Sequence, residues 1–215
     1  MKFSRLIGFA ALIFAVALPS AFAELKEGRD YRLAPTPQPV ANPAKIEVLE
    51  FFWYACPSCN DVQPALKKWK ATMPKDVEFR MMPAVFRPNW EPLAKAYYAL
   101  DAMGIEPRLH DKIYEAIHLD NIQLSDEKVM LDWMAKQGVD RQKFSEAYNA
   151  FAMQSKIARS KQAARDYGIQ GTPTLVVDGK YITSPAMAGS NEAVIPILNE
   201  LIEKARKERA AAGKK

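Results

Sequence analysis

The only two cysteines of this chain, Cys56 and Cys59, directly follow a strongly apolar run. The run covers residues 46–54, is rich in Val, Phe and other aromatic residues, and predicts a buried strand. After the cysteines, apolar residues recur at helical spacing, namely Val62, Leu66, Trp69 and Met73. The chain must therefore bring a strand directly to the start of an amphipathic helix, with two thiols at the junction.

A helix start is an environment that activates a thiol. Its free backbone N–H groups and the positive end of the macrodipole stabilise an anion. We therefore expect Cys56 to ionise easily and act as the nucleophile, and Cys59 to be the buried partner one turn further on. Pro57 suits the first turn, where its missing N–H costs no intrahelical bond. The pair predicts a redox-active Cys56–Cys59 disulfide that needs no other cofactor.

Two other interpretations of the pair are weaker. A structural disulfide across a loop of four residues stabilises a fold by only about 2 kcal/mol, the low end of the usual range. A zinc site needs about four ligands, and the only additional His or Cys residues, His110 and His118, have a spacing that matches no common zinc motif. We expect no metal.

The N-terminus has the pattern of an export signal. Lys2 and Arg5 precede an uncharged apolar stretch, residues 6–18, and an A-x-A cleavage site ends at Ala23. We expect cleavage after Ala23, so that residues 1–23 are a signal peptide. The apolar stretch is shorter than the roughly 20 residues of a membrane span, and export leads to an oxidising space in which disulfides persist.

The net charge of +5 does not indicate a nucleic-acid partner. Lys2 and Arg5 contribute two of these charges, and much of the remaining excess lies in the C-terminal tail, residues 204–215, where cations favour a helix end. The basic residues of that tail are not interleaved with aromatic residues. We therefore expect no nucleic-acid binding.

The rest of the chain alternates between strand and helix patterns. Residues 24–45 carry four prolines and predict an extended lead-in without helix, and residues 76–83 predict a second strand. In the helical region that follows, Ser125 is the expected N-cap of one helix, Gly138 ends it, and Asp140 starts the next. An apolar stripe continues from there toward Tyr167, and it consists of Phe144, Tyr148, Phe151 and Ile157.

A hairpin and a helix complete the pattern. Residues 174–177 and 180–183 flank Asp178-Gly179, a strong hairpin signal. Apolar residues from Ala193 to Leu201 then predict a final helix, which Pro196 should distort or delay.

Taken together, these motifs resemble the thioredoxin superfamily and, within it, the DsbA-like periplasmic thiol:disulfide oxidoreductases. The resemblance covers nearly all of the chain after the leader. It is carried by the run into Cys56-Pro57-x-Cys59, by Gly171-Thr172-Pro173-Thr174 before a Val-rich strand, and by a long helical insertion. It implies an α/β thioredoxin fold with an inserted α-helical subdomain. Residues 24–88 and 162–215 are expected to form the thioredoxin-fold domain and residues 89–161 the inserted helical subdomain.

The resemblance also implies roles for particular residues. Taken alone, Thr172-Pro173 favours an ordinary trans proline, whereas the resemblance implies a cis bond that places the Thr172 backbone beside the sulfurs to bind an extended substrate peptide. Where DsbA proteins commonly have histidine, this chain has Ser58, which carries no charge. A less stabilised Cys56 thiolate would lower the reduction potential.

The implied activity is donation of the Cys56–Cys59 disulfide to newly exported proteins. Reduced exported polypeptides and a DsbB-like quinone-linked membrane oxidase are the implied partners, the periplasm is the implied location, and we expect a monomer. Glu50, an acid in an apolar strand, is a candidate for handling the Cys59 proton if burial raises its pKa. Alternatively, Arg80 on the next strand pairs with it and keeps it charged.

Three other functions stay open from the sequence. A reductase of the same fold would have a low reduction potential. A disulfide isomerase usually has an additional N-terminal dimerisation domain, for which the 22 residues before the first strand leave no room. A peptide-binding chaperone would act after both cysteines are replaced by serine.

Overall fold

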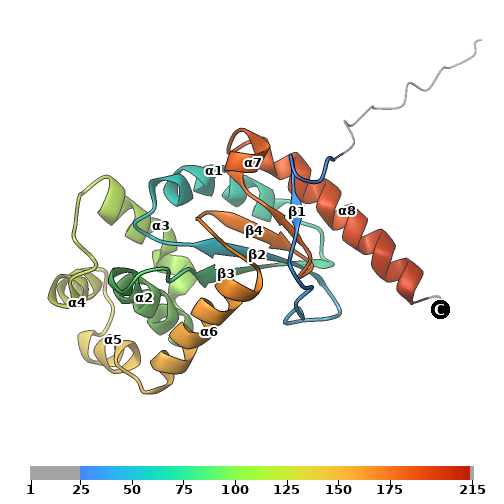
Figure 1. Ribbon diagram of the computed structural model, residues 1–215. Helices are drawn as coiled ribbons and strands as arrows, with labels where there is room; N and C mark the ends of the chain where they lie inside the picture. The colour runs from blue at the N-terminus through green and yellow to red at the C-terminus, as the bar shows by residue number, and fades with distance from the viewer. Residues whose placement is uncertain (1–24, 214–215) are drawn as a thin grey trace, which may run out of the picture.

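A five-stranded sheet lies at the centre of the computed structural model, which describes residues 25–213 (Figure 1). The expected signal peptide lies outside the described residues. In their order across the sheet, the strands are β1 (Arg32–Leu33), β5 (Tyr181–Thr183), β4 (Thr174–Val177), β2 (Ile46–Phe52) and β3 (Val77–Pro83). Strands β2 and β3 run parallel, and the other neighbouring pairs run antiparallel. Strands β2 and β3 confirm the two strands expected in residues 46–54 and 76–83, and β4 and β5 confirm the expected hairpin.

Helices cover both faces of the sheet, which explains why β2 is buried along its whole length. Helices α1 (Pro57–Ala71) and α8 (Val194–Ala212) pack on the face that carries Val48. The end of α6 (Ala152–Asp166) packs on the opposite face, which carries Leu49 (Figure 1). Since successive strand residues point to opposite faces, Glu50 lies on the α1 side and Glu47 on the α6 side.

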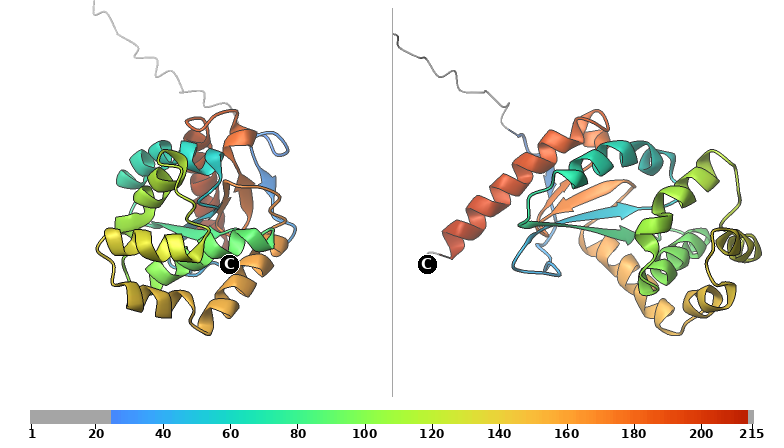
Figure 2. Two further views of the ribbon diagram at one scale, coloured as in Figure 1. Left: turned by 90° about the vertical axis from the view of Figure 1, so that its left-hand side faces the viewer. Right: turned by 180° about the vertical axis from the view of Figure 1, so that it is seen from behind.

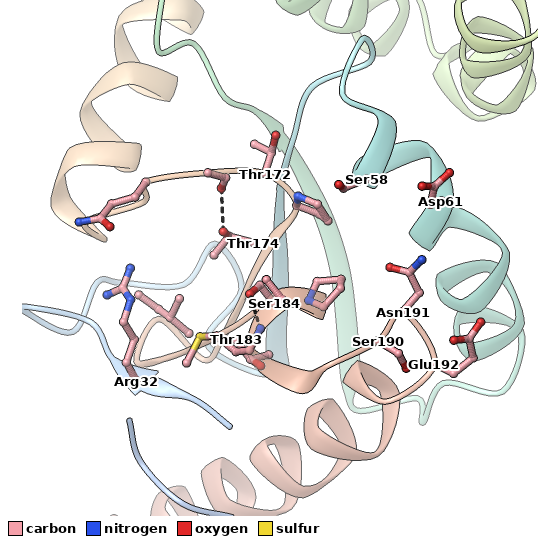
Figure 3. Close-up of a pocket in the computed structure, with 17 residues that line it drawn as sticks. Arg32, Ser58, Asp61, Thr172, Thr174, Thr183, Ser184, Ser190, Asn191 and Glu192 are labelled. Atoms are coloured by element: carbon pink, nitrogen blue, oxygen red, sulfur yellow. Dashed lines mark hydrogen bonds between the residues drawn. The ribbon is translucent and has the colours of Figure 1, made fainter. Parts of the chain in front are cut away.

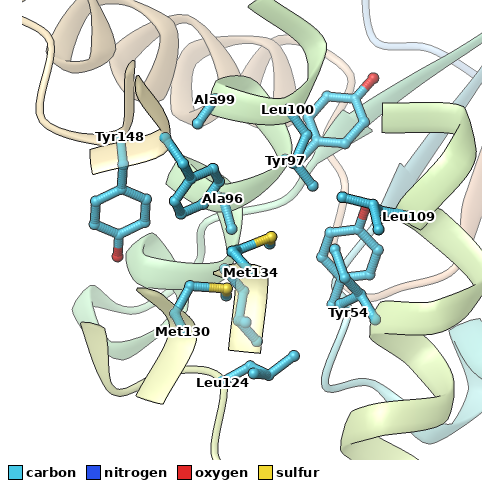
Figure 4. Packing of buried hydrophobic residues seen from close by; sticks show 14 of the residues in the cluster. Tyr54, Ala96, Tyr97, Ala99, Leu100, Leu109, Leu124, Met130, Met134 and Tyr148 are labelled. Carbon is cyan, nitrogen blue, oxygen red and sulfur yellow. The ribbon is translucent and has the colours of Figure 1, made fainter. Parts of the chain in front are cut away.

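Most of the other helices gather beside one end of the sheet, where β2 runs into α1 (Figure 2). They are the 3₁₀ turn η1 (Pro88–Trp90), α2 (Glu91–Ala102), α3 (Glu106–His118), α4 (Glu127–Lys136) and α5 (Arg141–Tyr148). Their apolar faces form a core of their own around Leu100, Met130 and Met134 (Figure 4). Tyr54 and Cys59 belong to the same cluster, so the helical block packs directly against the thiol segment.

Helix α6 belongs to both parts of this arrangement. Met153 and Ile157 near its start pack into the core of the helical block, and Ala164 near its end packs against the sheet. The expected subdomain boundary at 161/162 therefore falls inside a continuous helix. The domain division stays a prediction.

Two expectations in the helical region are wrong. Asp126, not Ser125, caps α4, because the Asp126 carboxylate accepts a hydrogen bond from the Val129 N–H at 2.9 Å. Phe151 does not continue the apolar stripe: the helix breaks after Tyr148, and Phe151 is 94% exposed in the turn before α6. The expected stop at Gly138 and restart at Asp140 are confirmed, with φ of 75° at Gly138 and Asp140 as the N-cap of α5.

The two ends of the described chain also differ from expectation. The lead-in is free of helix, as expected, but it contributes the edge strand β1, whose two residues are too few to show an alternating pattern. Pro196 does not delay α8, which begins at Val194, because its missing N–H falls in the first turn. The short helix α7 (Pro185–Ala188) was not expected. Within residues 25–213, no helix is long and apolar enough to cross a membrane.

Candidate active site

The thiols lie where the sequence places them, at the N-terminus of α1. Cys56 is the N-cap residue, with φ −84° and ψ 117°, and Pro57 opens the helix. Both cysteines are free thiols, Cys56 half-buried and Cys59 fully buried. The Cys56 carbonyl accepts hydrogen bonds from the N–H groups of Cys59 and Asn60, each at 3.1 Å, which fixes the first turn. Only the first of the two sulfurs is open to an incoming molecule.

The surroundings of Cys56 favour its thiolate. A hydrogen bond from the Cys59 thiol, together with weaker ones from the Thr172 side chain and the N–H groups of Cys59 and Ser58, lowers the Cys56 pKa to about 6, although partial burial opposes this shift. The Cys56 sulfur also lies 3.4 Å from the Thr172 carbonyl oxygen, a contact that only the neutral thiol makes as a donor. At neutral pH, Cys56 is therefore largely a thiolate stabilised by its neighbours.

Cys59 has the opposite character. Burial raises the pKa of its thiol far above the ordinary value, and the Cys56 thiolate beside it raises it further. When the disulfide opens, the thiolate that forms at Cys59 must therefore take up a proton from a nearby group. The two sulfurs have divided roles, one as a half-buried thiolate and one as a buried proton acceptor.

Glu50 is the buried acid on the Cys59 side of the sheet. Burial raises its pKa to about 7, while the charges of His110 and Lys70 oppose the increase. One carboxyl oxygen accepts a hydrogen bond from the Gln63 amide at 3.4 Å. The other has no partner among the described residues. Such a carboxyl can gain or lose a proton near neutral pH.

The alternative pairing of Glu50 with Arg80 is wrong. In the parallel register of β2 and β3, Arg80 lies opposite Leu49, so it shares the α6 face of the sheet and not the face of Glu50. Arg80 instead binds Glu47, with 2.7 Å between Nη1 and Oε2.

Two residues near Glu50 were not predicted as part of the site. The Gln63 amide also donates to the Cys59 carbonyl at 3.1 Å, and its oxygen lies 3.3 Å from His110 Nε2. Gln63 follows Cys59 by four residues, so a polar residue at this position of an apolar helix face was the available signal. His110 gave no such signal, because the contact joins residues far apart in the chain.

A cavity of about 590 Å³ opens beside the thiols. Ser58 and Asp61 on α1 form one wall, and Thr172 lies on another (Figure 3). Pro173 also lines the cavity. The Thr172-Pro173 bond is cis, which confirms the expectation from the resemblance. Thr172 is partly exposed on this wall, and its carbonyl oxygen contacts the Cys56 sulfur.

Ser58 is exposed on the cavity wall and contributes its backbone N–H to the Cys56 thiolate. In the part of the chain that the structure describes, no hydrogen bond joins the Ser58 hydroxyl to the sulfur. Nor does that part contain a group of three or more His, Cys, Asp or Glu side chains arranged to hold a metal ion.

An activated cysteine at a helix start, a buried second cysteine and a cis proline beside them define a thioredoxin-fold thiol:disulfide oxidoreductase. The comparisons with known proteins narrow this class. Residues 89–193 match the family model of the DSBA-like thioredoxin domain. The match begins after the cysteines, so it rests on the helical insertion and the segment with the cis proline.

The alignments with curated relatives are long enough to extend over the cysteine segment of this chain. The chain is 40% identical over 184 residues to the thiol:disulfide interchange protein DsbA of Azotobacter vinelandii, with 86% of each chain covered. It is 39% identical to DsbA of Bordetella parapertussis, over 95% of this chain and 98% of the other. This chain belongs to the DsbA family.

Solved structures of DsbA proteins have a similar fold. A crystal structure of Pseudomonas aeruginosa DsbA superposes with a TM-score of 0.81 at 38% identity, over 87% of this chain and 96% of that one. Reduced DsbA1 from Neisseria meningitidis gives a TM-score of 0.77 at 30% identity, over 88% and 99% of the two chains. The expected α/β thioredoxin fold with inserted helices is confirmed.

Proposed function

We propose that this protein donates its Cys56–Cys59 disulfide to reduced polypeptides that have been exported to the periplasm. The observation that carries the proposal is the division of roles between the two sulfurs. A Cys56 pKa near 6 favours the dithiol form, in which Cys56 is ionised, so the disulfide form is a strong oxidant. The export signal expected in residues 1–23 supports the location, and the relatives named thiol:disulfide interchange protein support the activity.

The transfer proceeds in two exchanges. A substrate thiolate attacks Cys56, a bond forms between the two sulfurs, and the Cys56–Cys59 bond breaks with its electron pair passing to Cys59. Cys59 takes up a proton. The second substrate thiolate then attacks the substrate sulfur of the mixed disulfide, and Cys56 leaves as a thiolate. The substrate loses two electrons and the protein gains them.

Four residues support these steps. Glu50 supplies the proton to Cys59, since its pKa near 7 lets it act as an acid. Thr172 and Pro173 present the backbone along which the substrate peptide lies, and Ser58 lines the same cavity. A DsbB-like quinone-linked membrane protein then accepts the two electrons and restores the disulfide. We also propose that the protein acts as a monomer, with residues 89–161 as a helical subdomain inserted into the thioredoxin-fold domain.

The test is oxidation of fully reduced ribonuclease by a stoichiometric amount of the disulfide form. We expect the substrate to lose two thiols for each protein disulfide. The Cys56→Ser and Cys59→Ser variants should be inactive, because neither can form the Cys56–Cys59 disulfide that oxidises the substrate. No loss of substrate thiols would refute the proposal.

Two further measurements separate the alternatives. In a glutathione buffer series, a disulfide donor becomes reduced in buffers in which a reductase of the same fold stays oxidised. A chaperone would still suppress aggregation of reduced substrate after both cysteines are replaced by serine.

A further inference from the structure

A path of buried polar side chains leads from the thiol helix into α3. The Gln63 amide nitrogen faces two oxygen atoms, the Cys59 carbonyl at 3.1 Å and the Glu50 carboxyl at 3.4 Å. Both can accept, so the nitrogen of the amide belongs on that side and its oxygen faces α3. Because that oxygen only accepts, His110 Nε2, 3.3 Å away, carries the donated hydrogen. The path therefore has a defined direction from His110 through Gln63 to Glu50.

The other side of the His110 ring is also occupied. Its Nδ1 lies 2.7 Å from a Glu106 carboxyl oxygen and 3.2 Å from the Tyr54 hydroxyl. An imidazolium satisfies both sides at once, with one N–H donated to Gln63 and the other to Glu106. Glu50, Gln63, His110 and Glu106 are all buried, so these contacts act in a medium of low polarity where charges interact strongly.

We propose that Gln63 and His110 are positioning residues, which hold the Glu50 carboxyl toward the Cys59 segment and keep it able to exchange the proton that Cys59 needs. This inference rests on the proposed function, because it assigns Glu50 the proton step. Gln63 supplies a hydrogen bond to Glu50. His110 orients Gln63 and supplies a positive charge on the far side of the amide.

The other groups around Glu50 explain why the hydrogen bond of Gln63 and the charge of His110 are needed. On α1, Lys70 adds a second favourable charge, and on α3, Glu106 opposes ionisation. The buried Tyr114 hydroxyl has no hydrogen-bond partner among the described residues. The neighbouring strands place Met81 and Leu175, which are uncharged, opposite Glu50. Without Gln63 and His110, burial alone would dominate and hold the carboxyl protonated.

The first test is an infrared pH titration of the Glu50 carboxyl, for which the Glu50→Gln variant identifies the band. Gln63→Met removes all three hydrogen bonds of the amide at similar volume. His110→Gln keeps a donor beside Gln63 but removes the charge. In each variant we expect the titration midpoint to rise by about one pH unit. The control is His118→Gln on the same helix: its ring contacts the Tyr54 carbonyl and not Gln63, so the midpoint should stay in place.

The second readout follows the proton itself. In a mixed disulfide between Cys56 and glutathione, the Cys59 thiol attacks the Cys56 sulfur, its proton passes to Glu50, and glutathione leaves as a thiolate. The pH profile of this ring closure should move upward with the Glu50 midpoint in both variants. A role limited to packing would change the rate at all pH values equally.

An unchanged Glu50 midpoint in a folded His110→Gln variant would overturn the proposal, even if Gln63→Met fails to fold. The infrared titration needs no substrate. A parent protein that does not oxidise ribonuclease would therefore refute the proposed function while the titration still decides whether Gln63 and His110 control Glu50.

Discussion

At the scale of single residues, the site depends on how differently two neighbouring thiols are solvated. Cys56 is half-buried and surrounded by hydrogen-bond donors, whereas Cys59 is fully buried behind it. The donors are backbone N–H groups and short side chains, so the amount by which they lower the Cys56 pKa depends on the geometry of the first helical turn. A change of one side chain can shift the chemistry without altering the fold.

The reactivity of Cys56 should depend on pH in a predictable way. We expect its alkylation by iodoacetamide to increase with a midpoint near pH 6, because only the thiolate reacts. The Cys56→Ser variant should show no alkylation in this range, since burial raises the pKa of the Cys59 thiol. A midpoint near the ordinary cysteine value, about 8.5, would contradict this assignment.

Ser58 should tune the redox equilibrium. Ser58→His places a positive charge near the first turn when the ring is protonated, so we expect a lower Cys56 pKa and a more oxidising disulfide. A tenfold change in the equilibrium constant with glutathione corresponds to about 30 mV. Both proteins are equilibrated in one glutathione buffer series. An equal or lower potential in the variant would mean that other groups set the redox balance.

At the scale of helices and strands, small features determine where each element begins. The N-caps Asp126 and Asp140 each accept a hydrogen bond from the third residue of the helix that they start. On β2 and β3, the parallel register decides which face each charge lies on, and it separates Arg80 from Glu50. Strands that are correctly predicted from the sequence can therefore still form ion pairs that the sequence does not predict.

The cap assignment gives a stability prediction. Asp126→Ala should lower the free energy of unfolding by about 1 kcal/mol, because the Val129 N–H in the first turn of α4 loses its acceptor. The neighbouring Ser125→Ala change is the matched control and should stay within about 0.5 kcal/mol of the parent. Urea unfolding of the three proteins measures both values. If Ser125→Ala lowers the free energy of unfolding more than Asp126→Ala does, Ser125 is the N-cap of α4.

At the scale of the whole molecule, the ionisation of Cys56 links stability to redox state. A lowered pKa stabilises the fold above the unfolded pKa, and this contribution is lost as pH falls through the folded pKa. The dithiol form gains this contribution and the disulfide form does not. We therefore expect the dithiol form to melt at the higher temperature at pH 8, and the difference to shrink as the pH falls from about 8.5, the ordinary cysteine pKa, to about 6, the Cys56 pKa in the fold. Calorimetry of both forms tests this, and a difference that does not change with pH would contradict it.

The sequence predicts the parts of this molecule that are local in the chain. The strand, the two cysteines, the following helix and the hairpin each fit within a short window. The contact of Gln63 with His110 spans 47 residues, so it arises only once α3 packs against α1. Likewise, Arg80 was placed beside Glu50 because a sequence does not state the register of two strands. Phe151 fits an apolar period, but the turn after Tyr148 takes it out of the helix.

Helix α6 also has a consequence for how the molecule opens. One end is anchored in the core of the helical block and the other on the sheet, about 22 Å apart for its 15 residues. If the block melts locally, α6 should fray from Ala152 toward Asp166 and not detach as a unit. Amide hydrogen exchange should therefore slow steadily along this one helix, so that the rate at each turn reports how far a local opening has spread.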